Sequence, residues 1–203
     1  MTDLLHDGPE GGPVFLFAHG AGAPMDSDFM DAIAGGLAGL GARVVRFEFS
    51  YMARRREDGK KRGPDRMDKL EARFEEVAAG FDAGELFIGG KSMGGRVASR
   101  VAAKLGVKGL VCLGYPFHPP GKPERLRTAH LAELDVPALI LQGERDPFGK
   151  PDEVEGYVLS EAIEVAWIGD GDHSLKPRKR SDYTLEGNME DAVGRIWAFM
   201  GAG

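Results

Sequence analysis

The sequence predicts an α/β fold in which a mostly parallel sheet of about six strands is covered by helices on both faces. Short runs of apolar residues alternate with segments of helical periodicity along the chain. The runs are apolar at successive positions, which is typical of strands buried on both faces of a parallel sheet. A third observation is the turn motif between one such run and the helical segment after it, Gly90-Lys91-Ser92-Met93-Gly94.

Size and composition fit a single domain, residues 1–203. The chain has 203 residues, of which 42% are hydrophobic, and this is enough for a sizeable core. A formal net charge of −6 argues against a general nucleic-acid-binding protein. Cys112 is the single cysteine, so no disulfide can form within the chain, and we expect a cytoplasmic protein. No apolar stretch approaches the roughly 18 residues of a membrane span, and the N-terminus lacks the features of a signal peptide.

The first half of the chain is expected to contain three strands and three helices. The strand candidates are 14–18, 43–49 and 86–89, and the helix candidates are 27–40, 67–81 and 96–105. Asp26 or Ser27 can cap the first helix with a side-chain oxygen, and Gly41 stops it. The segment 50–66 is polar and strongly basic, and we expect it to form a loop.

The second half repeats the alternation. Its strand candidates are 109–113, 137–141 and 163–168, and its helix candidates are 124–134, 151–159 and 188–200. In open α/β sheets, active residues gather at the carboxyl ends of the strands. Ser92, Asp146 and His173 each follow the end of a predicted strand, so we expect these three side chains to meet at one edge of the sheet.

Ser92 is the candidate nucleophile. A strand, the pattern Gly-x-Ser-x-Gly and a helix form a sharp turn that exposes the serine hydroxyl at strained backbone angles. Gly90 and Gly94 leave room for the crossing chain because they have no Cβ. The ending Gly90-Lys91-Ser92 is shared with phosphate-binding P-loops. A P-loop also needs a glycine five residues before Gly90, where this chain has Glu85.

His173 and Asp146 complete the expected order of serine, acid and histidine. His173 would take the Ser92 proton as general base, and Asp146 would hold the imidazole in the right tautomer. The pair Asp-Pro is also common in turns, so Asp172 and Asp170 stay open as alternative acids. Asp172 is next to His173 in the sequence, and its side chain is therefore poorly placed to reach that ring.

The oxyanion hole is expected to use two backbone N–H groups, those of Met93 and Ala21, with Gly22 as the alternative to Ala21. The loop after the first strand could otherwise be a plain glycine turn. It does not fit a dinucleotide-binding loop, because Met25 stands where the third glycine is needed. We expect His19 to bond within its own loop.

Four segments resemble the α/β-hydrolase superfamily, close to the dienelactone-hydrolase-like group. They are also similar to a branch named after a testis-expressed protein and a subunit of a histone acetyltransferase complex. The segments are His19–Gly22, Gly90–Gly94, Leu113–Pro119 and Gln142–Asp146. The resemblance covers nearly the whole chain and implies a compact α/β-hydrolase fold with a serine-hydrolase site. The chain departs from the superfamily in lacking its first two strands and any insertion long enough for a cap domain.

The expected function is a serine hydrolase that cleaves an ester or related acyl bond through an acyl-Ser92 intermediate. The chemistry needs no cofactor and no metal, and the expected partner is a small-molecule acyl substrate, with no nucleic acid or membrane. Thioester and peptide bonds stay open, as does the oligomeric state. The alternative is a non-catalytic interaction module that keeps the α/β-hydrolase fold.

Two further segments have open interpretations. The Pro-rich segment 115–123 either overhangs Ser92, placing Phe117 and His118 beside Gly22 in a small open pocket, or forms a rigid surface loop. The segment 54–62 has six basic and two acidic residues. It is either a solvated, mobile loop or a collar that attracts anionic substrates by electrostatic steering.

Overall fold

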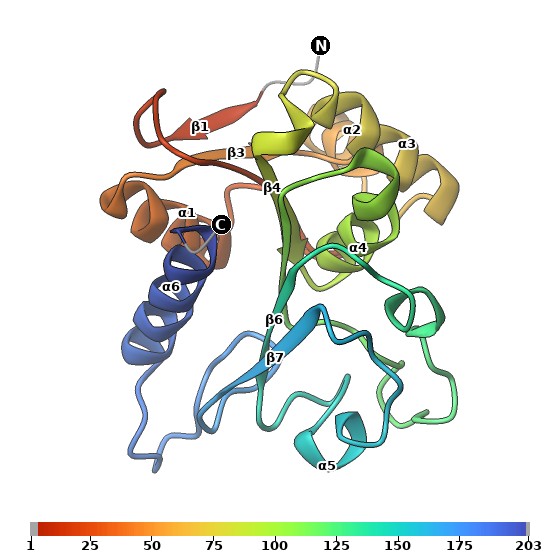
Figure 1. Ribbon diagram of the computed structural model, residues 1–203, viewed down its shortest axis with the longest axis vertical. Helices are drawn as coiled ribbons and strands as arrows, with labels where there is room; N and C mark the ends of the chain where they lie inside the picture. The colour runs from red at the N-terminus through yellow and green to blue at the C-terminus, as the bar shows by residue number, and fades with distance from the viewer. Residues whose placement is uncertain (1–3, 202–203) are drawn as a thin grey trace.

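The computed structural model describes residues 4–201, and a seven-stranded sheet runs through its centre (Figure 1). The strand order is β1-β3-β2-β4-β5-β6-β7, and every neighbouring pair is parallel except β1 with β3. The strands are β1 (Leu5–Asp7), β2 (Val14–Ala18), β3 (Arg43–Phe47), β4 (Leu86–Lys91), β5 (Gly109–Leu113), β6 (Ala138–Gly143) and β7 (Ile163–Ile168).

The seventh strand, β1, was not among the six that the sequence predicts. It has three residues and pairs antiparallel with the outer side of β3. An ion pair between Asp7 of β1 and Arg46 of β3, 2.9 Å between oxygen and nitrogen, ties this edge down. Three residues are too few to show a period in the sequence, and for this reason the strand count was one short.

Helices cover both faces of the sheet (Figure 1). One face carries α1 (Asp28–Leu40) and α6 (Leu185–Gly201), and the other carries α3 (Met67–Ala78) and α4 (Met93–Leu105). Successive side chains of a strand point to opposite faces. Phe15 and Phe17 therefore join the core under α1 and α6, whereas Leu16 joins the core under α3 and α4. This two-sided burial explains why the strands read as continuous apolar runs.

The prediction of a loop over 50–66 is wrong for its first part, which forms α2 (Ser50–Asp58). Tyr51 and Met52 are buried against the core, and they provide the apolar side of this helix. Gly59 ends it with a left-handed backbone, φ 68°. In the sequence, this helix has only two core-facing apolar residues, Tyr51 and Met52, followed by a run of arginines. Such a composition resembles that of a solvent-exposed loop.

Two predicted helices are shorter in the structure. Of 124–134, only the single 3₁₀ turn η2 (Ala129–Leu131) is helical, and of 151–159, only α5 (Pro151–Val154). The backbone of Arg127 is bonded instead to the segment before it: its N–H donates to the Phe117 carbonyl and its carbonyl accepts from the Tyr115 hydroxyl. These bonds take the place of a helical ladder. A further 3₁₀ turn, η1 (Ala83–Glu85), precedes β4.

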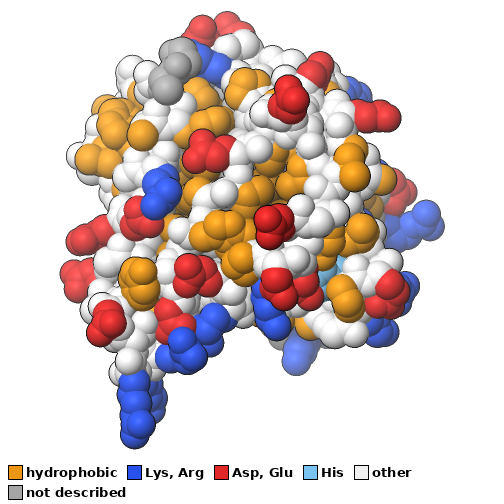
Figure 2. All heavy atoms as spheres, turned by 60° about the horizontal axis from the view of Figure 1, so that its bottom comes forward, with side chains coloured by type: hydrophobic (Ala, Val, Ile, Leu, Met, Phe, Trp, Pro, Cys, Tyr) orange, Lys and Arg blue, Asp and Glu red, His pale blue; other side chains and the backbone are white. Residues whose placement is uncertain are grey.

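Charged side chains of both signs are interspersed over the face in Figure 2, and basic ones gather on a projection at its lower left. The loop that leads into α6 carries three successive basic residues, Arg178, Lys179 and Arg180. No helix among residues 4–201 combines the length and apolar character that a membrane crossing requires.

Candidate active site

Ser92 is the one residue between the end of β4 and the start of α4, and its backbone is strained (φ 51°, ψ −113°). The turn is tight because its neighbours are glycines. A Cβ on Gly90 would lie 2.5 Å from the carbonyl carbon of Gly94 and 2.6 Å from the Ala18 carbonyl oxygen. The Ser92 N–H donates to the Leu113 carbonyl at 2.9 Å, which anchors the turn to β5.

A chain of hydrogen bonds connects the three predicted side chains. His173 Nε2 lies 2.8 Å from Ser92 Oγ, and His173 Nδ1 lies 2.8 Å from Asp146 Oδ2. Asp146 is fully buried, whereas a quarter of the His173 side chain is exposed. The second carboxylate oxygen of Asp146 accepts the Phe148 N–H at 2.9 Å. The loops after β4, β6 and β7 thus bring one serine, one acid and one histidine into contact.

The two alternative acids lie elsewhere. Asp172 accepts hydrogen bonds from the backbone N–H groups of Ser174 and Lys176, within its own loop. Asp170 pairs with Arg145 and Arg178, each at 2.8 Å. Burial acts to raise the pKa of the Asp170 carboxyl, but hydrogen bonds from the Arg178 backbone and from Ser181, together with the charges of Arg178 and Arg145, hold that pKa below its ordinary value.

Ala21 and Met93, the two residues predicted for the oxyanion hole, lie beside Ser92 and line the same cavity. Met93 is the first residue of α4, where backbone N–H groups have no partner within the helix. Within residues 4–201, neither its N–H nor that of Ala21 donates a hydrogen bond. Tyr51 anchors the loop that contains Ala21, because the Tyr51 hydroxyl donates a hydrogen bond to the Ala21 carbonyl at 3.0 Å.

His19 bonds inside its loop, as the sequence predicts. Its Nε2 accepts the Phe49 N–H at 3.1 Å, so Nδ1 carries the proton and donates to the Gly20 carbonyl at 2.7 Å. Burial lowers the pKa of His19, which keeps the imidazole neutral. This ring therefore fixes the loop after β2 and does not reach Ser92.

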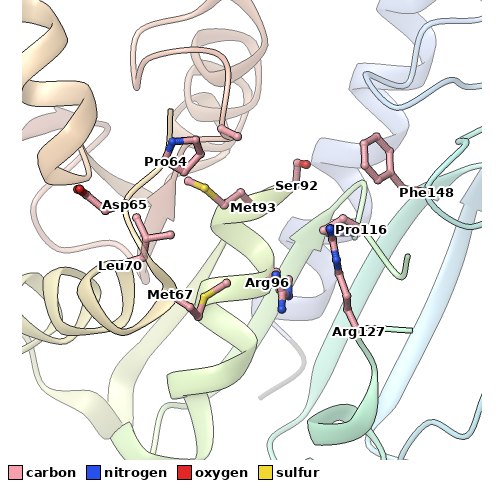
Figure 3. A pocket seen from close by; sticks show the side chains of 11 residues that line it. Pro64, Asp65, Met67, Leu70, Ser92, Met93, Arg96, Pro116, Arg127 and Phe148 are labelled. Atoms are coloured by element: carbon pink, nitrogen blue, oxygen red, sulfur yellow. The ribbon is translucent and has the colours of Figure 1, made fainter. Parts of the chain in front are cut away.

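A cavity of about 310 Å³ opens beside Ser92 (Figure 3). Its walls come from five parts of the chain: the loop after β2, the segment between α2 and α3 with the start of α3, the first turn of α4, the loop after β5 and the loop after β6. The lining residues are Ala21, Pro64, Asp65, Met67, Leu70, Ser92, Met93, Arg96, Pro116, Arg127 and Phe148.

The family follows from comparison with known proteins. The profile of the family described as "Alpha/beta hydrolase domain" matches residues 11–201. The chain belongs to this family. Solved α/β-hydrolase structures superpose on nearly the whole chain. Est1E from Butyrivibrio proteoclasticus, with ferulic acid bound, is 15% identical with a TM-score of 0.71, and the match covers 98% of this chain and 95% of that one.

Two further α/β-hydrolase structures give the same result. XC6422 from Xanthomonas campestris, described as a serine hydrolase without lid, is 24% identical with a TM-score of 0.66, covering 96% of this chain and 88% of that one. A serine hydrolase homologue from Coxiella burnetii is 20% identical with a TM-score of 0.67, covering 96% and 89%. At these identities the likeness establishes the α/β-hydrolase fold.

Sequence reasoning missed the groups that support His173 in this α/β hydrolase. The Phe148 ring packs against the His173 ring with 4.3 Å between centroids. The Lys91 ammonium donates to the His173 carbonyl. Gly114 packs closely against the Lys91 ammonium and the His173 carbonyl. A Cβ on Gly114 would lie 2.6 Å from Lys91 Nζ and 2.9 Å from the His173 carbonyl oxygen.

Lys91, one of the residues that hold His173 in place, is a buried cation. Burial lowers its pKa to about 8, although the negative charges of Asp146 and Asp172 act in the opposite direction. Its ammonium also lies 5.2 Å from the centroid of the Phe29 ring. A signal existed in the sequence: a lysine at the end of an apolar run has to be buried with a partner. The partner, a backbone carbonyl after β7, could be found only in three dimensions.

The pocket prediction needs correction. Phe117 is fully buried and packs on Tyr115 and Tyr157, and His118 is buried with its Nδ1 2.9 Å from the Pro119 carbonyl. Neither lines the cavity, and neither does Gly22, which is exposed to solvent. Apolar side chains in the Pro-rich segment turn inward to the core, and the residue that reaches the cavity is Pro116.

Three of the six basic residues in the segment 54–62 form ion pairs with carboxylates. Arg56 contacts Glu48 at 2.6 Å and Asp26 at 2.8 Å. The other ion pairs are Arg54 with Asp65 and Arg62 with Asp58. Its first half is helical, so a mobile loop does not describe it, and the pairing reduces the positive charge that a steering collar could use.

A second serine–histidine contact lies inside the molecule. Ser99 Oγ donates to the Arg96 carbonyl at 2.9 Å and lies 2.8 Å from His130 Nε2. Ser99 is buried in the middle of α4, and no carboxylate in residues 4–201 bonds to His130. Burial, together with nearby Arg100 and Arg96, lowers the pKa of His130 to about 4. The pair stabilises the packing of η2 on α4.

Proposed function

We propose that this α/β hydrolase is a serine hydrolase that cleaves an ester or related acyl bond through an acyl-Ser92 intermediate. The observation that supports the proposal is the hydrogen-bond chain from Ser92 through His173 to Asp146, with Ser92 on a strained turn. Strained residues cluster at functional sites because the surrounding structure has to hold them.

In the proposed mechanism, Ser92 Oγ attacks the substrate carbonyl while His173 Nε2 accepts its proton. Asp146 accepts a hydrogen bond from the Nδ1–H group of His173, which leaves the Nε2 lone pair directed at Ser92. The N–H groups of Met93 and Ala21 would stabilise the oxyanion. His173 then returns the proton to the leaving group. In the second stage, water attacks the acyl-Ser92 carbonyl while His173 accepts its proton, and His173 passes that proton to Ser92 Oγ as the acyl–oxygen bond breaks and the carboxylic acid leaves.

The substrate is proposed to have a small acyl group. A cavity of about 310 Å³ is at the lower end of the range typical of ligand pockets. Ferulic acid in the Est1E structure favours a carboxylic ester among the possible acyl bonds. We also propose that the chain belongs to the branch named after a testis-expressed protein and a histone acetyltransferase complex subunit, on the four segments quoted above.

Labelling with a fluorophosphonate probe tests the proposal. Such a probe forms a covalent bond with an activated serine, so the wild-type protein should be labelled and Ser92→Ala should not. Ser99→Ala is the matched control, because Ser99 also contacts a histidine, and it should be labelled like wild type. Folded wild-type protein that resists the probe would favour the non-catalytic module instead.

A further inference from the structure

Two arginines line the cavity beside Ser92. Arg96 is on the first turn of α4, and Arg127 precedes η2. Figure 3 shows their side chains on the same side of the cavity, with Pro116 next to Arg127. The two charges are close enough that Arg127 lowers the pKa of Arg96, in addition to the larger effect of burial.

Neither arginine forms an ion pair with a carboxylate among residues 4–201. The Nε atom of Arg96 is buried and has no hydrogen-bond partner in that part of the chain. On the same helix, Arg100 is paired with Glu71. A guanidinium stays charged at any ordinary pH, so the cavity holds two unpaired positive charges in a chain of net charge −6. Such charges are costly to bury unless a partner compensates them.

The rest of the cavity lining does not supply that partner. Asp65 is the one carboxylate on its wall, and it is paired with Arg54 at 2.9 Å. Met67, Leu70 and Pro116 make the wall near the arginines apolar. A ligand with a short apolar chain and an anionic end would match both features.

We propose that Arg96 and Arg127 bind a carboxylate at the far end of the substrate's acyl chain. The inference rests on the proposed hydrolase function and names its substrate class, esters of short dicarboxylic acids. The planar guanidinium matches a carboxylate with paired N–H donors. The leaving group has to meet His173 to be protonated, and His173 is not among the lining residues, so the cavity takes the acyl part.

The test compares two esters that differ in one charge: mono-4-nitrophenyl adipate and its methyl-capped neutral form. The ratio of their kcat/KM values, anionic over neutral, should be above one for wild type at pH 7.5. Arg96→Met and Arg127→Met should each lower this ratio roughly tenfold or more, since hydrogen bonds between charged groups are the strong ones. The neutral ester gives the reference rate within each variant, and circular dichroism and thermal unfolding verify that each variant is folded.

Arg125→Met is the matched control, because Arg125 is exposed, two residues from Arg127, and does not line the cavity. It should keep the wild-type ratio, and Arg96→Lys should keep part of it. Hydrolysis of both esters with equal ratios in wild type and in the two methionine variants would overturn the subsite and leave the proposed function intact.

If neither ester is cleaved, the proposed hydrolase function is contradicted. A binding measurement then tests the arginine subsite separately from that function. Calorimetric titration of Ser92→Ala with adipate then decides the subsite alone. Binding that weakens roughly tenfold in Ser92→Ala/Arg96→Met and in Ser92→Ala/Arg127→Met supports it. No binding, or binding that the arginine changes do not affect, overturns it.

Discussion

The ammonium of Lys91, the residue before the nucleophile candidate, donates a hydrogen bond to the backbone carbonyl of His173. The contact joins the tight turn after β4 to the loop after β7. In the sheet, β7 is an edge strand three positions away from β4. Lys91 therefore holds His173 by its main chain while Asp146 holds it by its ring. The two supports explain how an imidazole on a loop can keep a fixed distance to Ser92.

The burial of Lys91 should appear in the pH dependence of stability. Its pKa is about 8 in the folded chain and near 10.5 in the unfolded chain. Between these values the unfolded state binds more protons, so the stability contributed by Lys91 rises with pH and is lowest below pH 8. The free energy of unfolding of wild type minus that of Lys91→Met should rise by up to roughly 3 kcal/mol from pH 7.5 to 10.5.

Urea unfolding across this pH range measures the difference. Burial also raises the pKa values of Tyr51, Tyr115 and Cys112, and this lowers stability at high pH. These groups are present in both proteins and cancel in the subtraction. A difference that stays level or falls with pH would mean that Lys91 is not held as a buried cation.

Gly114→Ala should damage both stability and activity. Gly114 has φ 63°, and a Cβ there would press on Lys91 and His173. We expect a loss of about 1 to 3 kcal/mol in the free energy of unfolding and a reduction of kcat by tenfold or more. Gly121→Ala is the control, since Gly121 has φ 69° but no atom within 4 Å of the new Cβ. Equal effects of the two changes on kcat would refute a packing role for Gly114.

Arg56→Met should destabilise the protein through Glu48. Glu48 is almost completely buried, and its carboxylate forms an ion pair with Arg56 at 2.6 Å. Removal of that cation leaves a buried carboxylate without its partner. Because the Arg56 side chain is 48% exposed, we expect a reduced loss, roughly 1 to 3 kcal/mol. Lys60→Met, which changes an exposed cation of the same segment, should stay within about 0.5 kcal/mol in thermal unfolding.

Most of the sheet was predictable because a buried parallel strand leaves a local mark, a short run of apolar residues. The helix α2 was not, because Tyr51 and Met52 are its only buried residues and the arginines around them resemble a solvated loop. The helix predicted at 124–134 failed for a related reason. Its backbone partners, Tyr115 and Phe117, are too far away in sequence for periodicity to reveal them.

The meeting of Ser92, Asp146 and His173 was predictable because parallel strands end at a common edge. The walls of the cavity were not. Arg96 looks like one of several surface arginines on a helix, and Arg127 like part of a polar loop. Only the packing of η2 against α4 shows that their side chains share a cavity with the nucleophile candidate.

Single and double replacements should show that Ser92 and His173 act as a unit. Ser92→Ala, His173→Ala and Asp146→Asn should each lower kcat by several orders of magnitude, roughly 10⁴ to 10⁶. The double variant Ser92→Ala/His173→Ala should lose little more than either single one. Steady-state kinetics on a neutral ester, with circular dichroism to verify folding, measures this. Losses that multiply in the double variant would contradict a shared mechanism.

The most direct measurement is the position of the covalent adduct. Trypsin cleaves after Lys91, Arg96 and Arg100, so peptide 92–96 contains Ser92 and peptide 97–100 contains Ser99. Mass spectrometry of the fluorophosphonate-treated, digested protein should find the added mass on peptide 92–96, and none of it in the His173→Ala variant. An adduct on peptide 97–100, or equal labelling of peptide 92–96 without His173, would contradict acyl transfer through Ser92.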